Sequence, residues 1–172
     1  MIAIPVIETA RLRLRAPEAR DFDAYADFRG SDRARLLGGP YSRAQAFDQL
    51  CAIIGHWQLR GFGRWMVTDR ATDAPLGIVG LLHPEDWPEP EIAWSVFAPA
   101  EGRGIAEEAA RAARAHAYGT LGWTTAISFV DPANHRSVAL ARRLGCTEDA
   151  PFDHPTRGPM HVWRHPSPEA LS

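Results

Sequence analysis

The order of hydrophobic and polar positions predicts a strand followed by two helices at the start of the chain. Apolar residues alternate with arginines over Leu12–Ala16, which is the period of a half-buried strand. Helices are predicted over 18–29 and 42–57, and Ser42 and Gln45 at the start of the second have the spacing of a capping box. The apolar stripe expected to turn this second helix toward the core consists of Phe47, Leu50, Cys51, Ile54 and Trp57.

After Gly61 the pattern changes to that of β-strands. Strands are predicted over 62–69, 76–83 and 91–97, and an alanine-rich helix follows over 105–118. A strand over 124–130, a short helix over 134–144 that ends at Gly145, and two last strands within 146–165 complete the chain. The order β-α-α-β-β-β-α-β-α-β-β predicts an α/β fold, with a mixed central sheet of about six to seven strands flanked by about four helices.

Composition excludes several classes of function. All 19 cationic residues are arginine, so the chain has no Schiff-base lysine, no phosphate-loop lysine and no kinase-type lysine. The net charge is −2 and the arginines are interleaved with acids, so no nucleic-acid partner is expected. No apolar run is long enough to span a membrane, and the N-terminus lacks the basic start of a signal peptide. We therefore expect a cytoplasmic protein without a membrane partner.

Neither a repeat nor a low-complexity linker divides the chain. One domain is expected over 8–165, with short extensions at 1–7 and 166–172, and we expect a monomer or a homodimer. Two cysteines are too few for a disulfide framework. The spacing of Cys146 and the histidines after it matches no zinc site, so we expect no metal: the histidines are His154, His161 and His165.

One segment combines a strand, a glycine-containing turn and a helix. The strand over 91–96 leads to a turn formed by Glu101, Gly102, Arg103, Gly104, Ile105 and Ala106. Free backbone N–H groups at a helix N-terminus, approached closely past glycines, suit a phosphate group. The dinucleotide fingerprint is not met, because Glu107 occupies its third small position. From these residues alone, a tight turn without a ligand is an equal alternative.

Three motifs, in this order and spacing, resemble the GNAT superfamily of N-acetyltransferases. They are 91–96 (EIAWSV), 101–109 (EGRGIAEEA) and 134–145 (NHRSVALARRLG). The segment 8–15 (ETARLRLR) is similar to the first strand of the ribosomal-protein alanine N-acetyltransferases (RimJ/RimL-like), the branch that the chain resembles most. The resemblance implies a single-domain GNAT fold, acetyl-CoA as co-substrate, and acetyl transfer to a primary amine of a small molecule or a peptide N-terminus. It does not fix the acceptor.

The resemblance also implies which residues bind acetyl-CoA. The turn from Glu101 to Ala106 matches the family's pyrophosphate site, and the backbone of Ser95, Val96 and Phe97 matches the strand that pairs with the pantetheine arm. An amide there can also stabilise an oxyanion. Asn134 matches the asparagine that holds the pantetheine arm, and its residue type equally favours a helix cap; the two roles are compatible.

Glu101 departs from the family pattern, which has glutamine or arginine there. A carboxylate beside a pyrophosphate is unfavourable unless it points away or pairs with Arg103. Because the chain has no lysine, arginine has to supply every cationic contact to the phosphates; the candidates are Arg103, Arg136, Arg142 and Arg143.

The implied reaction is direct attack of the amine on the acetyl thioester in a ternary complex, which needs a base and an acid. Glu91 matches an acidic residue on this strand in several members and is the candidate base, with an edge-of-strand carboxylate of the acidic loop as the alternative and His83 as the second candidate. Many relatives use a tyrosine as the acid, but that position is Ala141, and Tyr118 lies on another helix. Ser137 matches the serine of the resembled branch and is the candidate donor or water-holder near the sulfur.

Two other functions remain compatible with the sequence. Glu101 and the missing tyrosine are features of a catalytically degenerate acyl-CoA-binding or sensor module, and the glycine-containing turn alone would also suit a nucleotide-binding protein. The acceptor is not specified. The acids Glu85, Asp86 and Glu89, in the loop before Glu91, are expected to attract a cationic amine.

Overall fold

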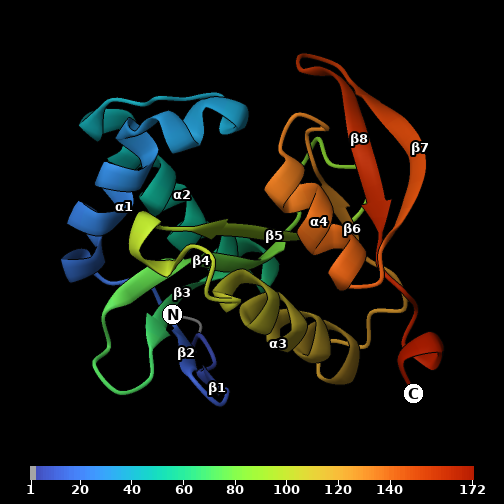
Figure 1. The fold of residues 1–172 in the computed structure, drawn as a ribbon, viewed down its shortest axis with the longest axis horizontal. Helices are drawn as coiled ribbons and strands as arrows, with labels where there is room; N and C mark the ends of the chain where they lie inside the picture. Colours follow the sequence, from blue (N-terminus) through green and yellow to red (C-terminus); the bar gives the residue numbers. More distant parts are fainter. Residues whose placement is uncertain (1–2) are drawn as a thin grey trace.

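A computed structural model describes residues 3–172 and contains one sheet with the strand order β1-β2-β3-β4-β5-β6-β8-β7 (Figure 1). Neighbouring strands are antiparallel except β5 and β6, which are parallel. The strands are β1 (Ile7–Glu8), β2 (Leu12–Arg15), β3 (Arg64–Asp69), β4 (Pro75–Leu82), β5 (Glu91–Val96), β6 (Ile127–Phe129), β7 (Thr147–His154) and β8 (Gly158–Arg164).

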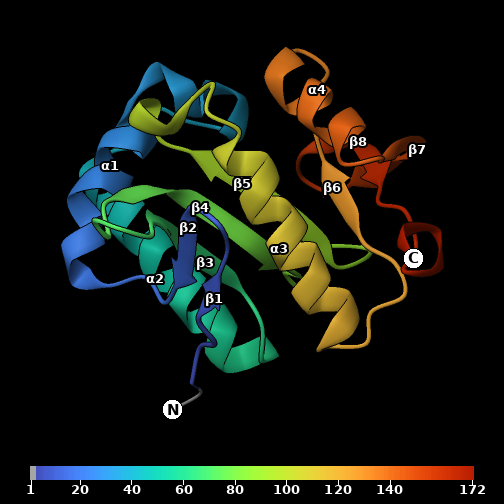
Figure 2. The ribbon, with the colours of Figure 1, turned by 60° about the horizontal axis from the view of Figure 1, so that its bottom comes forward.

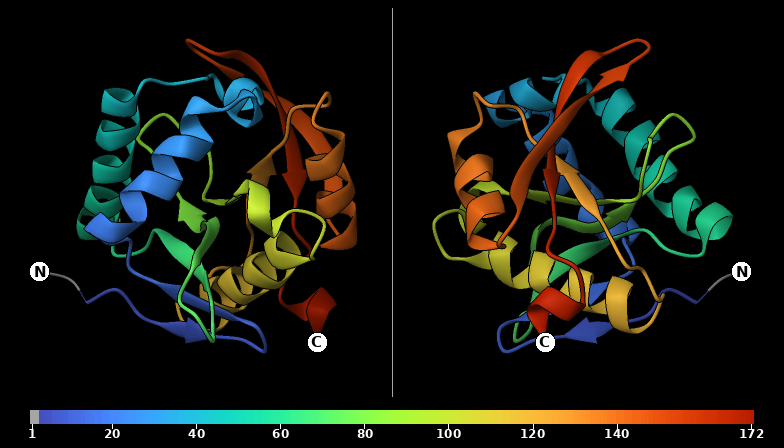
Figure 3. Two further views of the ribbon diagram at one scale, coloured as in Figure 1. Left: turned by 60° about the vertical axis from the view of Figure 1, so that its left-hand side comes forward. Right: turned by 90° about the vertical axis from the view of Figure 1, so that its right-hand side faces the viewer.

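Helices cover both faces of the sheet. The four α-helices of the described residues are α1 (Phe22–Gly30), α2 (Arg43–Arg60), α3 (Ile105–Gly119) and α4 (His135–Arg143). Helices α1 and α2 pack against one face, whereas α3 crosses the other face beneath β4 and β5 (Figure 3). The buried side of α3 consists mainly of alanines, which let the helix axis approach the sheet closely. The predicted α/β fold and the predicted order of elements are confirmed, with β1 as one additional strand.

The predicted orientation of α2 is wrong in part. Its buried residues are Ala46, Leu50, Ile53 and Trp57. The side chains of Phe47 and Ile54 are 55% and 42% exposed, and Cys51 is exposed as well. The helix is therefore rotated by about one residue from the predicted stripe. Apolar residues occur on both candidate stripes, and the small Ala46 permits the closer packing of α1 and α2.

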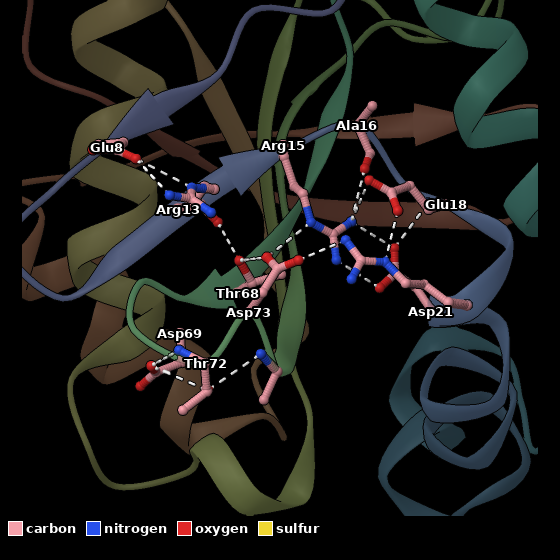
Figure 4. A network of polar contacts seen from close by, with 12 residues as sticks. Glu8, Arg13, Arg15, Ala16, Glu18, Asp21, Thr68, Asp69, Thr72 and Asp73 are labelled. Atoms are coloured by element: carbon pink, nitrogen blue, oxygen red, sulfur yellow. Dashed lines mark hydrogen bonds and ion pairs between the residues drawn. The ribbon is translucent and has the colours of Figure 1, made fainter.

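The start of α1 is fixed to the sheet by a buried ion pair (Figure 4). Arg15, the last residue of β2, donates to both carboxylate oxygens of Asp21 at 2.8 and 2.9 Å. Its Nε atom also donates to Asp73, in the turn between β3 and β4, at 3.0 Å. The guanidinium therefore connects three segments: the end of β2, the β3–β4 turn and the residue before α1.

The sheet separates between β5 and β6. These two strands are in register only at Glu91 and Ile127, and they run apart beyond this point (Figure 2). As a result the first two residues of β5 are buried, whereas the four from Ala93 to Val96 are partly exposed, although β5 lies in the middle of the sheet. Within residues 3–172, no helix is long and apolar enough to cross a membrane.

Candidate active site

The edge of β5 that faces β6 carries backbone groups without strand partners. The carbonyl groups of Pro90 and Ile92 point toward β6, because they accept hydrogen bonds from the Ile127 N–H at 3.1 Å and the Ser128 hydroxyl at 2.6 Å. Backbone direction alternates along a strand, so the N–H and C=O groups of Trp94 and Val96 point the same way. We refer to the backbone of Trp94 and Val96 as the free edge of β5.

The free edge overlaps only in part with the residues expected to pair with pantetheine. Val96 belongs to it, but the backbone N–H and C=O groups of Ser95 alternate to the other side of the strand and point toward β4. The backbone of Phe97 is already bonded: its N–H donates to Leu76 at 2.8 Å and its C=O accepts from Ala100 at 2.9 Å. Sequence reasoning missed Trp94; counting in twos from Val96 along the predicted strand would have found it.

Glu91 lies where β5 and β6 begin to separate. Its side chain bridges the two strands, accepting from the Trp87 indole N–H at 2.6 Å and from the Phe129 backbone N–H at 3.1 Å. The residue is the first of β5 and only 6% exposed, so its carboxyl group is enclosed rather than part of the exposed loop acids. Burial raises the pKa of Glu91 to about 7, while the two hydrogen bonds oppose the shift. A carboxyl group with this pKa is suited to proton transfer at neutral pH.

His83, the second candidate base, directly follows β4, at the end of β5 where β5 and β6 are still paired. It directly follows Leu82, the register partner of Glu91, and is thus on the far side of Glu91 from the free edge of β5. Its backbone N–H donates to the His56 ring at 3.0 Å. The position favours Glu91 over His83 as the group next to a substrate on the free edge.

The turn before α3 has the conformation that an anion site requires. Gly102 and Gly104 have φ angles of 69° and 73°, in the left-handed region that disfavours residues with a Cβ atom. No side chain caps α3, and the first hydrogen bond of the helix runs from the Glu108 N–H to the Gly104 C=O at 3.1 Å. The N–H groups of Ile105, Ala106 and the residue after them therefore remain available at the positive end of the helix dipole.

Glu101 is paired with two arginines rather than with Arg103. Its carboxylate forms ion pairs with Arg33, in the 3₁₀ helix Asp32–Leu37, and with Arg136 of α4. The Arg33 guanidinium, more than that of Arg136, holds the pKa of Glu101 below its usual range. Arg103 instead donates to the Pro99 C=O at 3.3 Å. The carboxylate is thus neutralised, and it connects segments that flank the turn on two sides.

The four arginines expected to contact the phosphates differ in whether a carboxylate of the protein already pairs with them. Carboxylates pair with Arg136, Arg142 and Arg143, whereas Arg103 makes no ion pair with a described residue. Beside Arg103 lies a hollow of about 510 Å³. Its lining includes two further arginines and the first residue of α3: the residues are Arg11, Arg70, Arg103 and Ile105. Arg11 pairs with Glu108 and Arg70 with Glu8, so Arg103 is the lining arginine whose charge no carboxylate of residues 3–172 compensates.

Residues of α4 face β5 across the separated strands. The Asn134 Oδ1 atom caps α4 by accepting from the Ser137 N–H at 3.2 Å, so the expected cap is present. Its amide nitrogen bonds to no residue within 3–172 and remains free for a ligand. The Ser137 hydroxyl accepts from the Trp94 indole N–H at 3.3 Å. Tyr118 is not near: its hydroxyl donates to the Pro166 C=O at 2.9 Å, beyond the other end of α3.

The acids of the loop before β5 all have partners. Glu85 forms an ion pair with Arg60, Glu89 pairs with both terminal nitrogens of Arg164, and the Asp86 carboxylate lies 2.8 Å from the ring of the buried His154. Arginines thus compensate the charges of Glu85 and Glu89, which weakens the field expected to attract a cationic amine. Within residues 3–172, no group of three or more histidine, cysteine or acidic side chains is arranged to hold a metal ion.

Comparison with known families identifies the fold. A family model described as an acetyltransferase (GNAT) domain matches residues 11–147. The chain belongs to the GNAT acetyltransferase family. A solved acetyltransferase from Agrobacterium tumefaciens is 36% identical, with 96% of each chain covered and a TM-score of 0.88. The ribosomal-protein acetyltransferase RimL, solved with coenzyme A, is 16% identical, with 94% of this chain and 97% of that chain covered and a TM-score of 0.76.

A ribosomal-protein-alanine acetyltransferase from Vibrio fischeri has the same fold at 13% identity, with 96% and 98% of the chains covered and a TM-score of 0.70. The predicted GNAT membership is confirmed by the family model, and both ribosomal-protein acetyltransferases share the fold of this chain. GNAT acetyltransferases use acetyl-CoA. This chain fits that co-substrate, because the left-handed glycines, the uncapped α3 and the free edge of β5 leave backbone donors for phosphate and amide groups.

Proposed function

We propose that this GNAT acetyltransferase transfers the acetyl group of acetyl-CoA to a primary amine by direct attack in a ternary complex. The observation that carries the proposal is the position of Glu91, a buried carboxyl group with a pKa of about 7 beside the free edge of β5. Its place on the strand puts it on the sheet face covered by α1 and α2, together with Ala93 and Ser95. We assign this face to the amine.

Each part of the cofactor has protein groups that suit it. The amides of Gly104, Ile105 and Ala106 would bind the pyrophosphate, with Gly102 and Arg103 shaping the turn and Glu101 held aside by its arginines. The free edge of β5 would pair with the pantetheine arm, and the Asn134 amide nitrogen would donate to it. When bound, acetyl-CoA supplies the activated acetyl thioester.

Glu91 and Ser137 would divide the proton transfers. A primary amine is largely protonated at neutral pH, so a proton has to leave before the amine can attack. The Glu91 carboxylate would accept this proton. On the α4 side of the free edge, the Ser137 hydroxyl would donate a hydrogen bond to the departing sulfur, which takes up the second proton that the amine nitrogen releases as the amide forms and the C–S bond breaks. RimL and the Vibrio fischeri protein are named for ribosomal-protein acceptors, which supports a peptide N-terminus as one class of acceptor.

An acceptor screen tests the proposal. The protein is incubated with acetyl-CoA and a panel of amines, amino acids, N-terminal peptides and aminoglycosides, and release of free CoA thiol is measured. We expect thiol release with at least one acceptor and a higher melting temperature with acetyl-CoA. A raised melting temperature without thiol release across the panel would instead indicate a sensor module. Displacement of acetyl-CoA by ATP or NAD at equal concentration would indicate a nucleotide-binding protein.

Substitution of Glu101 tests whether its carboxylate limits cofactor binding. Glu101→Gln removes a negative charge beside the proposed pyrophosphate site and frees Arg33 and Arg136 for the phosphates. We expect the Kd for CoA to fall by about threefold to tenfold in isothermal titration, which corresponds to about 1 kcal/mol. Glu148→Gln, an exposed carboxylate on β7, serves as the control with the same charge change. A weaker affinity for CoA would mean that the carboxylate is needed to position the turn.

A further inference from the structure

Arg64, the first residue of β3, is unusual among the arginines of this chain. Within residues 3–172, every other arginine has a hydrogen bond, an ion pair or an aromatic ring for its guanidinium, whereas Arg64 has none of these. The side chain is nevertheless partly buried, and burial lowers its pKa. Its guanidinium nitrogens are not among the fully buried unpaired atoms, so they still contact solvent. A partly buried guanidinium that no carboxylate of residues 3–172 pairs with is available to an anion of a ligand.

A second polar group near Arg64 also lacks a partner. Tyr25 of α1 is 4% exposed, and its hydroxyl forms no hydrogen bond with a residue of the described chain. Burial raises the pKa of Tyr25, and the positive charge of Arg64 opposes this shift, so the two groups are neighbours. The nearby Arg29 is already held, since it donates to Gln49 at 2.6 Å and lies 4.4 Å from the Tyr41 ring centroid.

The sheet register places Arg64 within reach of the proposed reaction site. Arg64 is opposite Gly80 on β4, and Gly80 is opposite Ala93 on β5. Neighbouring strands are about 4.8 Å apart, so the Cα atoms of Arg64 and Ala93 are about 10 Å apart. No side chain on Gly80 stands between them. Alternation along the strands places Arg64 and Glu91 on the same face as Ala93, the face covered by α1 and α2.

Charge on this face favours an anion over a second cation. Among the carboxyl groups, Glu91 is the one that acts on the pKa of Arg64. The two residues nevertheless form no ion pair, and the Glu91 oxygens accept hydrogen bonds from Trp87 and Phe129. The acids of the loop before β5 are paired elsewhere, as described above. The guanidinium of Arg64 and the hydroxyl of Tyr25 are therefore two hydrogen-bond donors with no acceptor among residues 3–172.

We propose that the acceptor is a small amino carboxylate and that Arg64 and Tyr25 bind its carboxylate group while its amine lies beside Glu91. This inference rests on the proposed function, because it assigns the acceptor of the same site. Arginine suits the task, since its planar guanidinium can donate two parallel hydrogen bonds to one carboxylate. Amines that lack a carboxylate would leave the buried cation unpaired and would be poor substrates.

Matched pairs of acceptors test the proposal on the unaltered protein and on a variant. Each amino acid of a panel is compared with its own amide, so that only the carboxylate differs. We expect kcat/KM to favour the free amino acids by at least about tenfold, and Arg64→Met to lower this preference by about 10- to 100-fold. Tyr25→Phe should lower it by a smaller factor, and the KM for acetyl-CoA should not change. Arg13→Met, which removes a surface arginine paired with Glu8, is the control.

Each outcome of the experiment distinguishes the two proposals. If no amine of any class is acetylated, the proposed function fails. If amides and amino acids react equally well, or Arg64→Met leaves the preference intact, only the carboxylate site is refuted. The proposal of a small amino carboxylate is also refuted if the enzyme prefers peptides with an acidic second residue and shows no preference for free amino acids over their amides. Arg64→Met should be at least as thermostable as the unaltered protein. If this variant does not fold, the preference of the unaltered protein for amino acids over amides and the effect of Tyr25→Phe on that preference decide the question.

Discussion

Replacement of Glu91 by glutamine is expected to lower kcat/KM for acetyl transfer by about 100-fold or more. Glutamine has nearly the same shape but cannot accept the proton of the attacking amine. The affinity for acetyl-CoA should change little, since Glu91 lies at the point where β5 and β6 separate and not at the turn that would bind the phosphates. Steady-state kinetics and CoA titration of both proteins measure the two quantities separately.

The pH dependence gives this prediction a second readout. With the pKa of Glu91 at about 7, the carboxylate form is the minor species below this pH and the major one above it. The kcat/KM of the unaltered protein should therefore rise with pH through about 7 and then level off. The residual activity of Glu91→Gln should lack this step. Glu85→Gln changes an exposed carboxylate in the loop before β5, and it should leave both kcat/KM and its rise near pH 7 unchanged.

Stability should respond to the same group with the opposite sign. The pKa of Glu91 is raised from an ordinary value of 4.5, so between pH 4.5 and about 7 the folded protein holds a proton that the unfolded chain has lost. The free energy of unfolding should then fall as the pH rises across this interval, by about 3 kcal/mol in total. Urea unfolding at several pH values should show this decline in the unaltered protein but not in Glu91→Gln. A normal rate and pH profile for the variant would leave Glu91 as a bridge between strands only.

Features that depend on neighbouring positions could be predicted from the sequence. The element order follows from local periodicity, and the turn follows from two glycines placed before a helix start, where positive φ angles occur in the structure. The position of Glu91 at the start of its strand was equally predictable. Its burial was not, because its hydrogen-bond partners are the Trp87 indole in a loop and the Phe129 backbone N–H on another strand.

Features that depend on distant partners were not predictable. Arg33 lies 68 positions before Glu101, and no local pattern indicates that the two form an ion pair. The rotation of α2 was missed for a related reason: its sequence offers two apolar stripes, and the packing of α1 decides between them. Arg64 carries no signal in the sequence at all, since a missing partner is visible only once the whole fold is known.

The buried ion pair beneath α1 is expected to have the largest effect on stability. Asp21 is almost completely buried and Arg15 nearly so, with side-chain exposures of 1% and 8%. Asp21→Ala would leave the Arg15 guanidinium with Asp73 as its main partner and would remove the acceptor of the Glu18 N–H, at 2.8 Å. Removing one member of a buried ion pair costs about 3–5 kcal/mol when the remaining charge has no other partner. Because Asp73 still pairs with Arg15, we expect a loss near the lower end of this range.

Asp23→Ala provides the matched control for Asp21→Ala, since Asp23 lies two residues further on and is 83% exposed in its pair with Arg43. We expect the control to cost less than about 1 kcal/mol in urea unfolding. Equal losses for the two variants would contradict a special role for the buried pair. The same pair fixes the start of α1, the helix that carries Tyr25. Asp21→Ala should therefore raise the KM for the acceptor more than the KM for acetyl-CoA, whose proposed site is built on β5, α3 and α4.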